Sequence, residues 1–120
     1  MVTRTSYQDG LRAEKIAAIL MRLKGYKILA TRFKTPVGEI DLVAKRGNTL
    51  VFTEVKLRKD KDAAAYAISE QGKQRISRAA AYYLSGRPDM QHMACRFDAI
   101  LIVPPFFVRH LDNVWTVSSY

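Results

Sequence analysis

Two acidic side chains and a lysine flank a turn in the stretch from Gly38 to Arg58, GEIDLVAKRGNTLVFTEVKLR. Asp41 precedes the Gly47-Asn48 turn signal, and Glu54 and Lys56 follow it. Turn residues between two apolar-rich runs are typical of a β-hairpin. We therefore expect the carboxylates of Asp41 and Glu54 to lie close together on neighbouring strands.

This pair of carboxylates predicts a divalent metal site, because like charges opposite each other destabilise a sheet and need compensation. With the main-chain carbonyl of Val55 between them, the carboxylates of Asp41 and Glu54 offer oxygen ligands that suit Mg²⁺ or Mn²⁺. Lys56 would face the same site, where an ammonium orients a water nucleophile or offsets charge on a phosphoryl group. The alternative is an edge hairpin with a solvated charged face, in which Glu54 and Lys56 only offset each other.

The hairpin also brings a third carboxylate to this patch. Residues two apart on a strand share a face, so Glu39, Asp41 and Val43 should point one way. Antiparallel pairing about the turn sets Asp41 opposite Thr53 or Glu54. The second strand should present a face formed by Leu50, Phe52, Glu54 and Lys56. Three carboxylates and a lysine therefore crowd together.

These residues resemble the motifs of known nucleases. Asp41, twelve intervening residues and Glu54-Val55-Lys56 look like the D…(D/E)-x-K signature of the restriction-endonuclease-like PD-(D/E)xK superfamily. More closely, GEIDLVA followed by LVFTEVKLR resembles the YraN family of endonuclease-like proteins, related in fold to archaeal Holliday-junction resolvases. Thr53 departs from that family, which more often has an aliphatic residue there. It should point away from the carboxylate face.

The resemblance implies a restriction-endonuclease-like α/β fold, with a mixed β-sheet flanked by helices. It implies hydrolysis of DNA phosphodiester bonds with Mg²⁺ or Mn²⁺, on branched or junction DNA, and a homodimer as the assembly. The expected catalytic residues are Asp41, Glu54 and Lys56, supported by Glu39, Glu14 and Lys73. The alternative is a DNA-binding or scaffold protein that keeps the nuclease fold without turnover.

A first helix, from Asp9 or Gly10 to Lys24, carries Glu14. Its core face is expected at Ala13, Ile16, Ile19, Leu20 and Leu23, which recur with a helical period. Glu14 lies roughly opposite that face, where a glutamate is ordinarily solvated. The resemblance instead places Glu14 beside the metal site.

A second helix should begin after Ser69 and run to about Leu84. Its apolar face is expected at Ile76, Ala80, Tyr83 and Leu84. Lys73 projects on the same side, so it either extends past the helix end or points into the site. The superfamily often brings a basic or amide side chain from this helix, and Gln71 is the weaker candidate.

The remaining segments predict the order α-β-β-β-α-β-β in a single domain of residues 1 to 120. Strands are expected at 26–33, 39–45, 50–56, 96–103 and 107–111, and a short helical turn at 63–68. The buried strand from Arg96 to Val103 should be reached by a crossover through the second helix. Trp115 should close the core.

The charge indicates a polyanionic partner. The chain has 20 Lys and Arg against 11 Asp and Glu, a net charge of +9. Residues 1–38 hold eight basic and two acidic side chains, so they supply +6 of this charge. DNA is the expected partner, although a basic protein without a polyanion has the same composition. An RNA-binding module would need an aromatic stacking stripe that is missing. The expected DNA contacts are Arg22, Lys24, Lys34, Arg58, Arg75 and Arg78.

Composition also limits the cellular compartments in which the protein is expected. Met1 to Gln8 contains no apolar segment typical of a secretory signal, and no run is long enough to span a membrane. Cys95 is the single cysteine, so no internal disulfide forms, and one cysteine with two distant histidines gives no zinc site. The cytoplasm is therefore the expected location.

Overall fold

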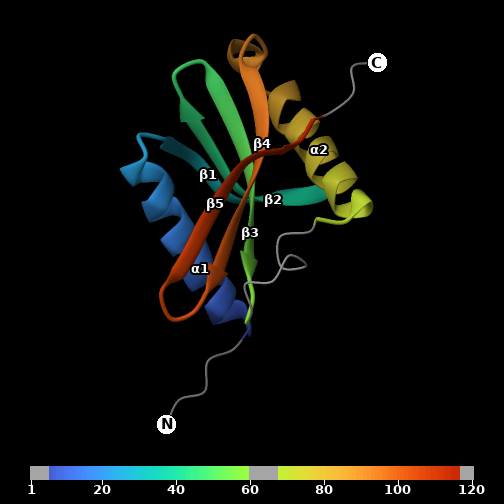
Figure 1. The fold of residues 1–120 in the computed structure, drawn as a ribbon. Helices are drawn as coiled ribbons and strands as arrows, with labels where there is room; N and C mark the ends of the chain where they lie inside the picture. The colour runs from blue at the N-terminus through green and yellow to red at the C-terminus, as the bar shows by residue number, and fades with distance from the viewer. Residues whose placement is uncertain (1–5, 60–67, 117–120) are drawn as a thin grey trace.

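The computed structural model describes residues 6–59 and 68–116, which form one five-stranded sheet with helices on both sides (Figure 1). The predicted order α-β-β-β-α-β-β is confirmed. The elements are α1 (Ser6–Leu23), β1 (Lys27–Thr35), β2 (Gly38–Arg46), β3 (Thr49–Leu57), α2 (Glu70–Ser85), the 3₁₀ helix η2 (Pro88–Met90), β4 (Ala94–Val103) and β5 (Phe107–Trp115).

The strands lie side by side in chain order. β1, β2 and β3 form the predicted antiparallel meander, with Gly47 at positive φ (59°) in the turn between β2 and β3. β4 pairs parallel to β3 after the crossover through α2, and β5 returns antiparallel along the outer side of β4. The sheet is therefore mixed, as predicted, with β1 and β5 at its edges.

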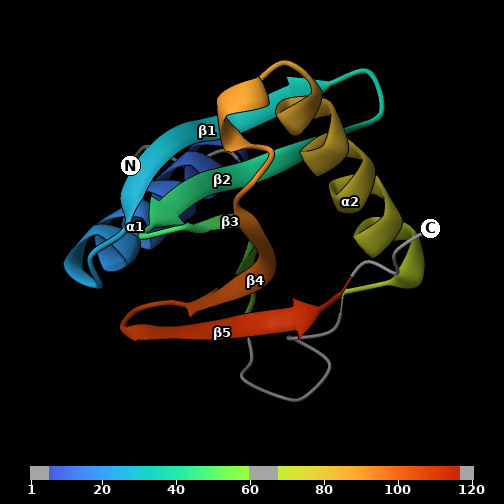
Figure 2. The same cartoon turned by 90° about the horizontal axis from the view of Figure 1, so that it is seen from above.

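Two apolar clusters fill the space between the sheet and its helices, which lie on opposite sides (Figure 2). Neighbouring residues of β3 alternate between the clusters, since Val51 packs toward α1 whereas Leu50 and Phe52 pack toward α2. Trp115 joins the α2 cluster, stacking on Phe97 with ring centroids 4.8 Å apart. Trp115 thus packs against the core, as expected.

The second helix matches its prediction closely. The Ser69 side chain accepts a hydrogen bond from the Gly72 N–H and caps α2 at its N-terminus. Ile76, Ala80 and Tyr83 are buried as expected, and Leu84 is partly buried.

The predicted core face of the first helix is wrong for three of its five residues. Ile19 and Leu23 are 54% and 81% exposed, and Ile16 is also exposed. Ala13 is buried as predicted and Leu20 packs partly against the core, but the other buried side chains of α1 are Glu14, Ala17, Ala18 and Met21. Small alanine side chains let the helix lie close to the sheet, so the bulkier isoleucines fall outside the contact.

Strict alternation also fails in β2. Ile40 and Val43, three residues apart, both pack toward α2, while Leu42 packs toward α1. Val43 therefore does not share a face with Glu39 and Asp41, as had been expected. The opposing strand is irregular here as well, with a register shift between Ile28 and Ala30. The irregularity lets Asp41 turn toward the α1 side next to two buried apolar residues.

The expected helical turn at 63–68 lies almost wholly outside the described residues, which resume at Ile68. In the described part of the chain, no helix is long and apolar enough to cross a membrane.

Candidate active site

Asp41 sits where the β2–β3 ladder ends. The last paired residues are Leu42 and Thr53. Asp41 is the next residue of β2 beyond this pair, and Val55 follows Thr53 by two residues on β3. The Val55 N–H donates a hydrogen bond of 2.8 Å to Oδ2 of Asp41 instead of to a strand carbonyl. The carboxylate thus takes over a main-chain donor that the separating strands leave behind. This bond fixes Asp41 against the backbone between Glu54 and Lys56.

The environment of Asp41 is unfavourable for a negative charge. The pKa of Asp41 is raised from its usual 3.8 to about 6, and burial is the largest cause. The Val55 hydrogen bond opposes this increase, and the nearby carboxylates of Glu14, Glu54 and Glu39 add to it. Three further acids therefore act on one carboxyl, as the predicted crowding requires. A bound cation would relieve this repulsion.

Glu54 and Lys56 belong to β3 and lie near Asp41 of β2. The Lys56 ammonium is 4.0 Å from Oε1 of Glu54, so these side chains share a side as expected. The other oxygen, Oε2, is buried without a hydrogen-bond partner among the described residues. A buried carboxylate oxygen without a donor is costly, and it is a natural position for a cation.

Arg32 is a site residue that the sequence did not reveal. Its Nε is 3.1 Å from Oε1 of Glu14 and 3.8 Å from Oε1 of Glu39, so one guanidinium bridges both acids. The residue has a positive φ of 50°, and it stands opposite Asp41 between the pairs Thr31–Leu42 and Phe33–Ile40. This conformation is uncommon for a residue with a side chain, and it aims the guanidinium at α1.

Glu14 is buried, contrary to the solvated alternative. Burial raises the pKa of Glu14, the adjacent Arg32 guanidinium lowers it, Glu39 raises it, and the net shift is upward. Glu14 and Glu39 therefore border the Asp41 patch, but their charges are directed to Arg32.

The other expected residues lie further away. The Lys73 ammonium pairs with Glu70 at 3.1 Å and lines a separate cavity of about 560 Å³ beside Trp115. Lys24 binds a ring nitrogen of His110 at 2.7 Å. The remaining expected DNA contacts are exposed and lie on three different parts of the fold: Arg22 on α1, Lys34 and Arg58 at strand ends, and Arg75 and Arg78 on α2.

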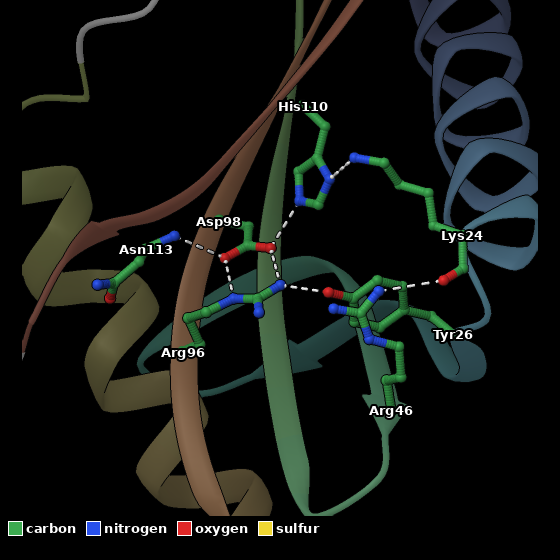
Figure 3. A network of polar contacts seen from close by, with 7 residues as sticks. All are labelled: Lys24, Tyr26, Arg46, Arg96, Asp98, His110 and Asn113. Carbon is green, nitrogen blue, oxygen red and sulfur yellow. Dashed lines mark hydrogen bonds and ion pairs between the residues drawn. The ribbon is translucent and has the colours of Figure 1, made fainter.

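A second polar cluster, also not predicted, surrounds Asp98 of β4 (Figure 3). Asp98 is fully buried and accepts hydrogen bonds from both Nε and an Nη atom of Arg96, from the Asn113 main chain and from the ring of His110. Arg96 in turn donates to the hydroxyl of Tyr26. Burial raises the pKa of Asp98, but the bonds from His110, Arg96 and Asn113 outweigh it, so the net shift is downward. This cluster ties β5 to β4 and to the end of α1.

The residues around Asp41 fit a divalent cation in donor type. Asp41 and Glu54 supply carboxylate oxygens, one of them buried and unpaired, and the Val55 backbone lies against Asp41. Hard oxygen donors suit Mg²⁺ and Mn²⁺. Within residues 6–59 and 68–116, however, no three His, Cys, Asp or Glu side chains are grouped so as to hold a metal alone. A metal here would depend on two carboxylates, a carbonyl and water.

The fold is that of the resolvase and restriction-endonuclease-like proteins. The structure of Archaeoglobus fulgidus Hjc, a Holliday junction resolvase from an archaeal hyperthermophile, superposes with a TM-score of 0.59 at 19% identity. The similarity covers 84% of this chain and 73% of that one.

Sequence comparison then identifies the family. Residues 13–102 match the uncharacterised protein family UPF0102, and the chain belongs to this family, which is the YraN family of the resemblance. A UPF0102 protein of Parvibaculum lavamentivorans is 49% identical over 110 residues, covering 92% of this chain and 83% of the relative. One from Nitrobacter winogradskyi is 46% identical over 114 residues, covering 95% and 97%.

Proposed function

We propose that the protein is a metal-dependent DNA endonuclease that hydrolyses phosphodiester bonds. The observation that carries the proposal is the pair Asp41 and Glu54, in which the Asp41 carboxyl is fixed by the Val55 N–H and Glu54 has a buried oxygen, Oε2, without a donor among the described residues. A fold does not ordinarily retain such a pair unless a ligand completes it.

The proposed roles follow from position. Asp41, Glu54 and the Val55 carbonyl would hold Mg²⁺ or Mn²⁺, which when bound polarises a phosphoryl oxygen and acidifies a water. Lys56, near Glu54, orients the attacking water or offsets the negative charge that develops on the phosphoryl group. Glu14 and Glu39 act with Arg32 to position this patch. Lys73 is assigned no chemical step, because its ammonium pairs with Glu70.

DNA is the proposed substrate, since the chain carries a net charge of +9 around an acidic centre. The solved neighbour is described as a Holliday junction resolvase, which makes branched DNA the form to test first. A junction presents more than one strand to be cut, so a homodimer with two sites would suit it. We place this activity in the cytoplasm, consistent with a single free cysteine, Cys95, among the described residues.

The test is a cleavage assay with Mn²⁺ on linear, flapped and four-way DNA, beside the same reactions in EDTA. Asp112, an exposed residue of β5, supplies the matched control variant Asp112→Asn. Cleavage that requires Mn²⁺, survives Asp112→Asn and disappears in Glu54→Gln supports the proposal. Equal cleavage in wild type and Glu54→Gln would assign the activity to a contaminant or to another site.

One observation favours the alternative, a DNA-binding or scaffold protein without turnover. Arg32 engages both Glu14 and Glu39, so only two acids remain for a metal. A non-catalytic protein would bind four-way DNA equally well in EDTA and in Mn²⁺, and would leave every substrate uncut at high enzyme concentration.

A further inference from the structure

A cavity of about 380 Å³ lies between α1 and β1, immediately beside the Asp41 patch. Glu14 and Arg32 belong to both, because they line the cavity and border Asp41. The volume falls within the range of about 300–1,000 Å³ that is usual for ligand pockets. The described residues that line it are Leu11, Glu14, Lys15, Ala18, Ile19, Arg22, Thr31 and Arg32.

The charge of this cavity is positive. Among the described residues of the lining, Lys15, Arg22 and Arg32 are cationic and Glu14 is the single acid. Arg32 is paired with Glu14, whereas Lys15 and Arg22 have no ion pair or side-chain hydrogen bond within residues 6–59 and 68–116. Two uncompensated cations at one cavity favour an anionic ligand with more than one charged group or with a neighbouring charge.

The wall between these cations is apolar. Lys15, Ile19 and Arg22 follow one another along one strip of α1, at helical spacings of four and three residues. The two cations are thus about 10 Å apart along the helix axis. Between them Ile19 is 54% exposed, a high value for an isoleucine. Leu11 and Ala18 extend this apolar surface.

We propose that the cavity binds a single unpaired nucleotide of a DNA strand next to the proposed site of cleavage. Within a strand, a nucleotide places the flat face of its base beside a phosphate on each side of its sugar, which matches an apolar wall flanked by two cations. A base within a duplex keeps both faces stacked, so only an unpaired base can cover Ile19. The cavity would thereby select strands with unpaired nucleotides, such as those at branch points.

This inference rests on the proposed function, since it takes the ligand to be part of DNA. Its test is therefore performed in EDTA, where cleavage plays no part. If the nucleotide binds but no substrate is ever cut, only the proposed endonuclease activity fails. If cleavage occurs but no nucleotide binds in the cavity, only the present inference fails.

The first experiment measures fluorescence anisotropy of labelled oligothymidylate and of a duplex of equal length. Lys15→Gln with Arg22→Gln should weaken single-strand binding by about tenfold or more, and duplex binding clearly less. The matched control is Lys27→Gln with Lys45→Gln, which removes the same charge from exposed positions on β1 and β2. Equal effects of the two double variants, or an equal loss for duplex, would overturn the inference.

The second experiment separates a nucleotide from a bare phosphate. In NMR titrations, deoxyadenosine monophosphate should shift the methyl resonances of Ile19 and Leu11, and deoxyribose 5-phosphate should shift them much less. Ile19→Ser should weaken binding of the nucleotide, and since Ile19 is more than half exposed the fold tolerates the change. Equal shifts from both compounds would reduce the cavity to a phosphate site, and absent shifts from the nucleotide would refute it.

Discussion

Asp41→Asn should stabilise the protein in the absence of metal, although it removes a proposed ligand. The pKa of Asp41 is raised from 3.8 to about 6, mainly by burial. The folded state therefore holds this proton more tightly than the unfolded chain. Between pH 4 and 6 folding stability falls as pH rises, and above pH 6 the full cost of the buried charge remains.

The magnitude follows from the shift. About two pKa units at 1.36 kcal/mol each correspond to about 3 kcal/mol. Asp41 is partly accessible to solvent, which reduces the cost to about 1–2 kcal/mol. An asparagine oxygen still accepts the Val55 N–H, so little is lost in exchange. In a chain of this size the melting temperature should rise by about 5 °C at pH 7.

Thermal melts monitored by circular dichroism between pH 4 and 8 test this prediction. The gain from Asp41→Asn should be full at pH 7 and should disappear toward pH 4. The control Asp112→Asn, at an exposed position, should change stability by less than about 0.5 kcal/mol at every pH.

Added Mn²⁺ should reverse the order of stability. A ligand that binds only the folded state stabilises it, so wild type should gain with Mn²⁺ concentration while Asp41→Asn gains little. Calorimetry should correspondingly detect weaker Mn²⁺ binding by the variant. If Asp41→Asn lowers the melting temperature at pH 7 without metal, the argument from the buried charge is wrong. If both proteins bind Mn²⁺ equally, the metal site is wrong.

Further predictions address catalysis, DNA binding and the fold. Glu54→Gln should reduce cleavage by orders of magnitude while metal-free DNA affinity holds or rises, because a ligand contributes several kcal/mol to the transition state. Lys56→Ala should reduce cleavage and also lower DNA affinity modestly, as kinetics and anisotropy would reveal. The log of DNA affinity should fall with the log of salt concentration by about 0.9 per phosphate contact, and reversing the charge of Arg22 and Lys24 should flatten this slope. Asp98→Asn should cost about 3–5 kcal/mol in urea denaturation at pH 7, and the difference should shrink as pH falls below 3.8, where wild type also loses the charge.

The hairpin and the proximity of Asp41 to Glu54 could be predicted because they depend on neighbouring residues. Alternation and a Gly-Asn turn determine which strands pair, and Gly47 has the positive φ that such a turn requires. The order of elements follows for the same reason. Ser69 likewise predicts the start of α2, since a capping side chain acts within one helical turn.

The face of α1 could not be chosen from hydrophobicity. Ile16, Ile19 and Leu23 give the stronger apolar period, but the sheet accepts Ala13 and Ala17, whose size allows close contact. The strip that holds Glu14 and Met21 does contain little charge, which was the one sign of burial. That strip packs on the sheet because Arg32, on another element, compensates Glu14.

Arg32 and the Asp98 cluster were missed because their partners are distant in the chain. The bond from Arg96 to Tyr26 spans 70 residues, and the bond between Lys24 and His110 spans 86. No local pattern reports such contacts. Arg32 depends in addition on a positive φ, which residue type alone does not indicate for arginine.

Asp98 is fully buried, whereas Asp41 and Glu54 are partly exposed, and the chain satisfies their carboxylates differently. This difference is why we assign structure to Asp98 and function to Asp41 and Glu54. Asp98 of β4 pairs with Thr53 of β3, and Thr53 directly precedes Glu54. Asp98 and Glu54 therefore lie in the same region of the fold. Around Asp98 the chain supplies hydrogen bonds from Arg96, His110 and the Asn113 backbone. The fold is thus capable of satisfying a buried carboxylate fully.

At Asp41 and Glu54 the described chain supplies fewer hydrogen bonds than at Asp98. Asp41 receives a hydrogen bond from Val55, Glu54 keeps a buried oxygen without a donor, and Arg32 engages Glu14 and Glu39 rather than these two. Sequences agree with their structures at most positions, and unresolved local conflict concentrates where a ligand must bind. This contrast with Asp98 is why we propose that a cation from outside the chain completes the Asp41 patch.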